Sequence, residues 1–264
     1  MKTASLIFAA GKGSRMKGFD GNKTLLPLIP DQSIFQGRQP ILLHLLYNLP
    51  QGPKALVVNY KKEEVIKATL SFKLTYCEQS VLNGTGGALL AARKFIEEQD
   101  YDRLIITMGD VPFISAETYR KLVKGLKHHS MVVLGFCPED KKQYGLIETV
   151  GDAVTKIIEW KYWKSYPKDS LKLLRICNSG IYAARKDDLV PYLLDLEKSP
   201  HVVSKERGGK LVKIEEYFIT DLVELLGKDG LGTGYVIAGA EDNAMGVDDL
   251  SSLKKAQGIF MNLS

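Results

Sequence analysis

The sequence predicts an α/β fold with a mainly parallel mixed sheet and a small antiparallel excursion. Short apolar runs alternate with helical patterns through the first half, which implies parallel strands joined by right-handed crossovers. After residue 143 two alternating segments surround a turn, which is typical of an antiparallel hairpin. The 264 residues, 45% hydrophobic and 25% charged, fit one domain of ordinary globular composition.

The expected elements follow from apolar periodicity and from the turn residues between them. In the first half we expect strands at 6–10, 55–59, 73–77, 103–108 and 131–136, and helices at 41–49, 62–70, 86–99 and 117–127. In the second half we expect hairpin strands at 144–149 and 154–160, strands at 173–183 and 235–238, and helices at 186–196, 215–226 and 249–260. Two long surface connections are expected at 31–40 and 195–209.

Composition excludes several classes of protein. No apolar run reaches the roughly 18 uncharged residues of a membrane span, so we expect no membrane association. The net charge of +5 is mild and spread along the chain, which does not favour nucleic-acid binding. Three cysteines far apart (Cys77, Cys137 and Cys177) fit buried thiols of a reducing compartment, so we expect a cytoplasmic protein.

The segment 4–16 carries the clearest chemical signal, because a buried apolar run ends in a glycine-rich cationic loop. Gly11 and Gly13 allow a backbone to approach a ligand, and Lys12 and Arg15 can meet negative charge. Open α/β sheets bind nucleotides at such a loop after the first strand. A plain strand-to-helix turn is the alternative.

Two better-known phosphate loops are excluded. A Walker loop needs a glycine five residues before its Gly-Lys, and that position is Leu6. A dinucleotide fingerprint needs a third glycine where the chain has Met16.

A second polar segment follows the expected third strand. Gln79 offers both a donor and an acceptor, enough to read the edge of a base. Gly84 and Thr85 supply backbone N–H groups at a helix start, which suit a base, ribose or phosphate. Glycine before a helix is also common without any ligand.

Two aspartates suggest a metal site. Asp110 follows the buried strand 103–108 in Gly109-Asp110-Val111-Pro112, and a carboxylate at this edge is a natural Mg²⁺ ligand. Asp248 could meet Asp110 across a shared cation, while Asp249 could cap the closing helix. For Asp110 the alternative is a turn or a helix cap.

Taken in order, these segments resemble the sugar-nucleotide pyrophosphorylases, and they are most similar to the bacterial uridyltransferase domain that makes UDP-N-acetylglucosamine. The resemblance runs from about residue 4 to 260. It rests on the opening loop, Gln79 with Gly84-Thr85-Gly86, Gly109-Asp110-Val111-Pro112, Tyr144-Gly145, Ile158-Glu159, Asn178-Ser179-Gly180, Tyr217-Phe218-Ile219-Thr220-Asp221 and Gly246-Val247-Asp248.

The resemblance implies a Rossmann-like three-layer α/β/α nucleotidyltransferase fold in one domain, 1–264. Residues 1–137 would mainly bind nucleotide, 138–245 mainly sugar, and 246–264 would complete the metal site and end in a helix. The catalytic residues would be Lys12, Arg15 and Lys23. The nucleotide would contact Ala10, Gly11, Gly13, Gln79, Gly84, Thr85 and Gly109. The sugar would contact Gly145, Glu159, Asn178 and Thr220, and Mg²⁺ would bind Asp110 and Asp248.

The implied reaction joins UTP to a sugar 1-phosphate, with Mg²⁺, and releases pyrophosphate. TTP, CTP or another sugar 1-phosphate is the near alternative, and a non-catalytic nucleotide-sugar sensor is a more distant one. A nicotinamide oxidoreductase lacks its fingerprint. No acetyltransferase activity is expected, because the chain has no hexapeptide repeats. Assembly into a homo-oligomer stays open.

Three residues depart from the family pattern. Asn22 stands where the family usually has proline before the lysine matched to Lys23, and the loop is about one residue longer. Asp248 stands where asparagine is common, and Phe218 replaces a tyrosine near the acetamido group. The nucleotide site is therefore better supported than the identity of the sugar.

Overall fold

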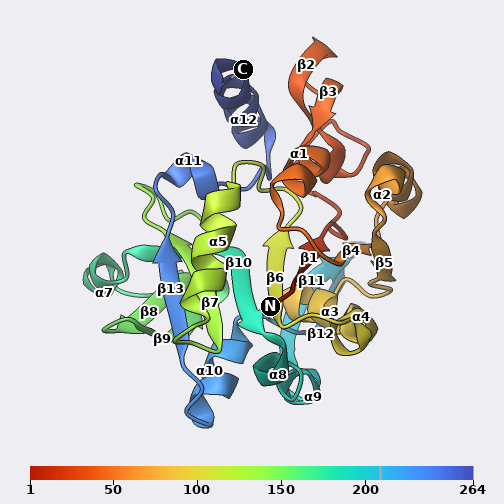
Figure 1. Cartoon of the computed structure of the whole chain (residues 1–264). Helices are drawn as coiled ribbons and strands as arrows, with labels where there is room; N and C mark the ends of the chain where they lie inside the picture. The colour runs from red at the N-terminus through yellow and green to blue at the C-terminus, as the bar shows by residue number, and fades with distance from the viewer. Residues whose placement is uncertain (208–209, 264) are drawn as a thin grey trace.

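The computed structural model describes residues 1–207 and 210–263. Its centre is a mixed sheet with helices on both faces (Figure 1). The strand order is β5-β4-β1-β6-β10-β7-β13-β9-β8. The strands are β1 (Thr3–Phe8), β4 (Lys54–Val58), β5 (Thr75–Glu78), β6 (Arg103–Met108), β7 (Met131–Phe136), β8 (Leu146–Val150), β9 (Ala153–Ile158), β10 (Ile176–Arg185) and β13 (Thr233–Ile237).

The longer helices other than α12 pack on the sheet, and the shorter ones lie in the connections between strands. The longer ones are α1 (Ile41–Asn48), α2 (Lys62–Thr69), α3 (Gly84–Ala91), α5 (Ala116–Gly125), α10 (Asp221–Lys228) and α12 (Leu250–Leu263). The shorter ones are α4 (Arg93–Glu98), α6 (Trp160–Trp163), α7 (Lys168–Leu173), α8 (Lys186–Leu189), α9 (Tyr192–Glu197) and α11 (Glu241–Ala244). This arrangement confirms the three-layer α/β/α expectation.

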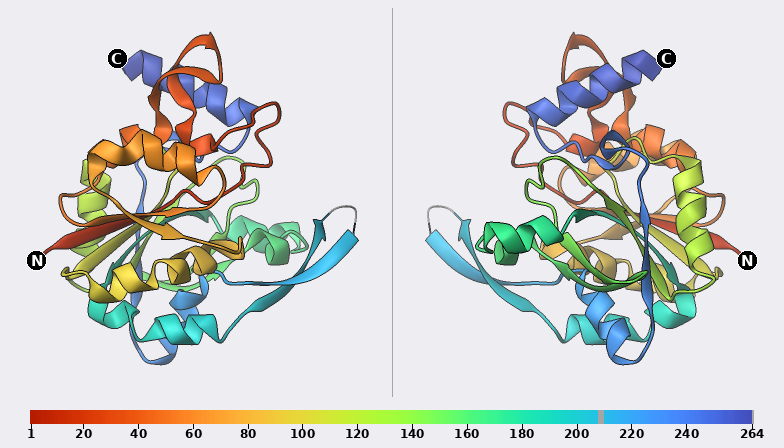
Figure 2. Two further views of the ribbon diagram at one scale, coloured as in Figure 1. Left: turned by 90° about the vertical axis from the view of Figure 1, so that its right-hand side faces the viewer. Right: turned by 90° about the vertical axis from the view of Figure 1, so that its left-hand side faces the viewer.

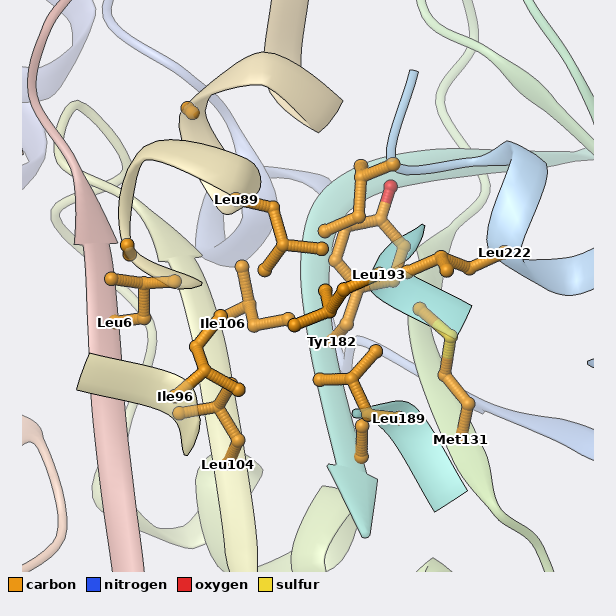
Figure 3. Packing of buried hydrophobic residues seen from close by; sticks show 14 of the residues in the cluster. Leu6, Leu89, Ile96, Leu104, Ile106, Met131, Tyr182, Leu189, Leu193 and Leu222 are labelled. Carbon is orange, nitrogen blue, oxygen red and sulfur yellow. The ribbon is translucent and has the colours of Figure 1, made fainter. Parts of the chain in front are cut away.

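The strands β5, β4, β1 and β6 form the parallel half of the sheet. β1 pairs in parallel with β4 and β6, and β4 pairs in parallel with β5. Leu6 and Ile7 are both fully buried but belong to different hydrophobic clusters, because successive strand residues point to opposite faces. Leu89 of α3 packs over Ile106 and Tyr182 on one of these faces (Figure 3). Burial on both faces explains the continuous apolar runs in the sequence.

The antiparallel part is joined to the same sheet. β10 runs antiparallel to both β6 and β7, and β8 and β9 form the expected hairpin at the edge. The register of β10 against β7 shifts between Asn178 and Tyr182, and Gly180 inside this bulge has φ +79°. The expected strand 173–183 begins later than predicted, because residues up to Leu173 complete α7.

Both expected connections contain hairpins instead. Residues 31–40 belong largely to β2 (Pro27–Ser33) and β3 (Gln36–Pro40), which pair with each other. The segment 195–209 ends α9 and then forms β11 (His201–Arg207), although 208–209 lie outside the described residues. β11 pairs antiparallel with β12 (Lys210–Glu216) along its whole length, and the cross-strand pair Val203 and Ile214 is apolar on both strands. This hairpin projects from the body (Figure 2).

Two expected helices also change their limits. The helix expected at 215–226 starts at Asp221, because Glu215 and Glu216 end β12. The helix expected at 86–99 is divided at Ala92, whose backbone (φ −95°, ψ 9°) interrupts it between α3 and α4.

The closing helix packs on the first small hairpin. Gln257 of α12 is buried, and its Nε2 donates to the carbonyl oxygens of Pro27 (2.9 Å) and Ile34 (2.8 Å). These bonds anchor α12 on the β2–β3 hairpin. Among the described residues, no helix has the length and apolar character needed to cross a bilayer.

Candidate active site

A cavity of about 350 Å³ opens at the carboxyl ends of β1 and β6, beside the start of α3. Eight residues predicted from the sequence line it: Ala10, Gly11, Lys12, Lys23, Gln79, Gly84, Thr85 and Asp110. Gly13 and Gly109 do not line the cavity but allow close packing beside it. A Cβ on Gly13 would lie 3.2 Å from Lys23, and one on Gly109 would lie 3.0 Å from the carbonyl oxygen of Phe8.

Lys23 is placed by Asn22, the residue that departs from the family pattern. Asn22 is 1% exposed, and its Nδ2 donates to the carbonyl oxygens of Ala9 (3.0 Å) and Tyr60 (2.9 Å). Its Oδ1 accepts from the N–H and the hydroxyl of Thr24, at 3.0 and 2.8 Å. The asparagine therefore caps the short helix Lys23–Leu25 and ties it to the end of β1.

Lys23 joins the two aspartates predicted to bind metal. Its ammonium group forms ion pairs with Asp110 and with Asp248, and Arg15 lies 3.1 Å from Asp248. Burial lowers the pKa of Lys23, but the two carboxylates outweigh this effect and raise it above its ordinary value. The Val247 N–H donates to the Asp110 carbonyl oxygen at 2.8 Å, and this bond brings Asp110 and Asp248 together although they are far apart in the sequence.

The aspartate pair fits a divalent cation. Both side chains present oxygen atoms to one positive group, which is the donor chemistry that Mg²⁺ prefers. In residues 1–207 and 210–263 no cluster of three or more His, Cys, Asp or Glu side chains accompanies them. Substrate phosphates and water would therefore complete the coordination of a bound Mg²⁺.

A larger cavity of about 680 Å³ adjoins the first one. All four predicted sugar-binding residues line it, from four separate segments: Gly145, Glu159, Asn178 and Thr220. Thr85 and Met108 line both cavities. Asp110 lines the first cavity and Asp248 the second, so the Lys23 ion pairs lie where the two cavities meet.

Glu159 and Asn178 are held by hydrogen bonds inside the larger cavity. The Thr220 hydroxyl donates to Glu159 Oε1 at 2.8 Å. Burial raises the pKa of Glu159 above its ordinary value. Asn178 Nδ2 donates to the Tyr182 hydroxyl at 2.7 Å, and its Oδ1 accepts from the Gly180 N–H at 2.9 Å. The β10 bulge thus fixes the Asn178 amide from both ends.

The loop before α3 is tied to the segment that carries Thr220. The Gly86 N–H donates to the Tyr217 carbonyl oxygen, and the Tyr217 N–H donates to Asn83, both at 2.8 Å. The Ile219 N–H donates to the Thr85 hydroxyl at 3.2 Å. These bonds connect the loop before α3 to the segment of Thr220, and Thr85 itself lines both cavities.

Several residues that line the larger cavity were not predicted as site residues, among them Met108, Lys142 and Tyr182. Lys142 could have been found, because it closes a Lys-Lys pair two residues before Tyr144-Gly145. Tyr182 lies four positions after Asn178 on one strand, but its contact depends on the bulge between them.

Comparison with known proteins identifies the relatives of this chain. Residues 5–196 match the model of the MobA-like NTP transferase domain. Bifunctional protein GlmU of Sphingopyxis alaskensis is 35% identical over 232 residues, which are 86% of this chain and 46% of that protein. GlmU of Ruegeria pomeroyi is 30% identical over 265 aligned positions, which cover 98% of this chain and 53% of that protein. The chain therefore spans about half the length of these relatives.

Solved structures share the fold across the whole chain. A putative glucose-1-phosphate thymidylyltransferase from Bacillus anthracis has a TM-score of 0.67 at 20% identity, covering 97% of this chain and 94% of that one. A CMP:2-keto-3-deoxy-manno-octonic acid synthetase complexed with CTP has a TM-score of 0.66 at 16% identity, with full coverage of both chains. With the family model matching well over half of its residues, the chain belongs to the MobA-like NTP transferase domain family.

Proposed function

We propose that this protein is a Mg²⁺-dependent nucleotidyltransferase that forms a UDP-sugar, UDP-N-acetylglucosamine in first place, from UTP and a sugar 1-phosphate. One observation carries the proposal: the Lys23 ion pairs with Asp110 and Asp248 lie at the junction of the two cavities. One cavity would hold the nucleotide and the other the sugar, so the junction is where their phosphates would meet.

The chemistry needs charge neutralisation more than a base. An oxygen of the sugar 1-phosphate attacks the α-phosphorus of the triphosphate, and the bond from this phosphorus to the bridging oxygen breaks. Pyrophosphate leaves with that electron pair. Because the attacking oxygen is already anionic, positioning and cationic contacts can supply most of the catalysis. When bound at Asp110 and Asp248, Mg²⁺ would neutralise phosphate charge.

The cations of the site have separate roles in this proposal. Lys12 lines the nucleotide cavity, and we assign it to the departing pyrophosphate together with Arg15. Arg15 is 57% exposed at its side chain and lines the larger cavity, so its guanidinium can reach phosphate oxygens without unfolding any element. Lys23 would exchange its carboxylate partners for substrate phosphate.

The polar residues of each cavity support the two halves of the substrate. Gln79 is buried, and its Nε2 donates at 3.1 Å to both Asn83 Oδ1 and the Gly84 carbonyl oxygen. Both amide N–H groups are thereby used within the protein, and the amide oxygen is assigned to the base. In the other cavity Thr220 holds one oxygen of Glu159, and the second oxygen is assigned to a sugar hydroxyl.

One panel tests the proposal. Each of the four common nucleoside triphosphates is paired with several sugar 1-phosphates and Mg²⁺, and pyrophosphate release is measured. We expect the fastest release of pyrophosphate from UTP with N-acetylglucosamine 1-phosphate. In the variant Asp110→Asn we expect this release to be lost. Faster release with TTP, CTP or another sugar would replace the substrate assignment. No release from any pair, with a UDP-sugar still bound, would establish a sensor and refute catalysis.

A further inference from the structure

His201 lies outside the larger cavity, yet it closes a ring of contacts that runs through Glu159 and Thr220. It is the first residue of β11, where the projecting hairpin leaves the body (Figure 2). His201 Nε2 lies 2.7 Å from Asp221 Oδ2, and Nδ1 lies 2.8 Å from the Tyr162 hydroxyl. Both ring nitrogens are therefore used, each by a different element.

The two partners of His201 are connected to Thr220 and Glu159, two of the polar residues that line the larger cavity. Asp221 directly follows Thr220 at the start of α10. Tyr162 lies in the single turn of α6, and its N–H donates to the carbonyl oxygen of Glu159 at 2.9 Å. Since Thr220 donates to Glu159 at 2.8 Å, the ring closes on itself.

The ring adds side-chain contacts to α6 and to the segment 217–220. Other bonds also hold these two segments: the Trp163 indole N–H donates to the Tyr144 carbonyl oxygen at 2.8 Å, and the Ile219 N–H donates to the Thr85 hydroxyl. α6 has four residues, and Glu159 at its start carries no side-chain cap. An isolated turn of this length does not hold a stable orientation by itself. The His201 ring also packs edge-on against Phe218, with centroids 4.9 Å apart, two residues before Thr220. The imidazole thus contacts the two segments that carry Glu159 and Thr220.

We infer that His201 is a positioning residue for the sugar subsite, setting the Glu159–Thr220 pair through Tyr162 and Asp221 while touching no substrate atom. This inference rests on the proposed transfer to a sugar 1-phosphate. Displacing Glu159 by a fraction of an ångström would weaken its hydrogen bond to a sugar hydroxyl. Binding of the nucleotide should not change, because neither His201 nor its two partners line the nucleotide cavity.

The decisive variants are His201→Phe and Tyr162→Phe. His201→Phe keeps a ring against Phe218 but removes both hydrogen bonds, and Tyr162→Phe removes one hydroxyl alone. We expect the KM for the sugar 1-phosphate to rise about tenfold in His201→Phe and about threefold in Tyr162→Phe. The KM for the nucleoside triphosphate should stay within about twofold of the wild-type value, because the contacts that bind this substrate are unchanged.

A conservative variant separates positioning from folding. His201→Gln can still donate from its amide to Asp221, so it should restore at least half of the lost sugar affinity. Circular dichroism and thermal melting confirm that each variant is folded. Equal KM values for the sugar in wild type, His201→Phe and Tyr162→Phe would overturn the inference, as would an equal rise in both substrate KM values. A wild-type protein that reacts with no sugar 1-phosphate would instead refute the proposed function itself.

Discussion

Replacing Asn22 with alanine tests whether this residue holds the loop that follows β1. The substitution removes four hydrogen bonds: two donated by Nδ2 to Ala9 and Tyr60, and two accepted by Oδ1 from Thr24. Each such bond contributes a net 0.5–1.5 kcal/mol in typical proteins, and this side chain is 1% exposed. We therefore expect the free energy of unfolding to fall by about 3 kcal/mol. The melting temperature should drop by roughly 6–10 °C.

Urea unfolding followed by circular dichroism measures this loss. The exposed Asn243 on α11 provides a matched control, and Asn243→Ala should change stability by less than about 0.5 kcal/mol. Asn22→Asp is a sharper variant, because it keeps the acceptor for Thr24 but turns the donor into an oxygen facing two carbonyl oxygens. At neutral pH it should destabilise the protein at least as much as alanine does.

The refuting result is a loss below about 1 kcal/mol in Asn22→Ala, the value of a single exposed cap. It would mean that the asparagine does not tie the loop to β1. Turnover, measured where both proteins are folded, should also fall in Asn22→Ala, because Lys23 follows directly in the chain and depends on the same short helix.

Three further predictions concern the site itself. Arg15→Ala should lower kcat by about 10²-fold with the fold intact, since it removes a charge near the phosphates. The control is Arg38→Ala, because Arg38 is exposed on β3. Near-normal turnover in Arg15→Ala would remove Arg15 from the mechanism. Gly84→Ala should cost about 2 kcal/mol or more of stability, because Gly84 has φ +95° and a Cβ would lie 2.4 Å from a carbonyl oxygen. Gly227→Ala, with open space around its Cβ on α10, should be neutral or stabilising by comparison, and equal urea midpoints for the two variants would contradict this account. Burial raises the pKa of Glu159 above its ordinary value of 4.5, so the folded state favours the protonated carboxyl. The stability that this group contributes is therefore fully present below pH 4.5 and is lost as the pH rises through the folded-state pKa. The melting temperature of Glu159→Gln relative to wild type should therefore be higher at pH 7 than at pH 4.5. A difference in melting temperature that does not change with pH would show that burial does not perturb this group.

Much of the fold was predictable because its signals are local. Apolar runs such as 103–108 and 131–136 need only their own residues to appear as buried strands, and the structure has both with the predicted limits. The predictions were wrong where contacts with residues far away in the sequence determine the secondary structure. The segment 195–209 is polar, and its strand β11 pairs with a strand that follows it in the chain, β12, which supplies the cross-strand contacts.

The candidate site divides in the same way. The groups of the site could be identified from the sequence: a cationic glycine loop after the first strand, and aspartates at positions 110 and 248. They follow from residue chemistry and from the rule that ligands bind at the carboxyl edge of parallel strands. How these groups meet could be learned only from the folded chain. It showed that Asn22 anchors Lys23 through four side-chain bonds, and that the ammonium group joins the two aspartates at the junction of the cavities. The physical reason is that ion pairing and burial depend on distances of a few ångströms between segments far apart in the sequence, and no local pattern records those distances.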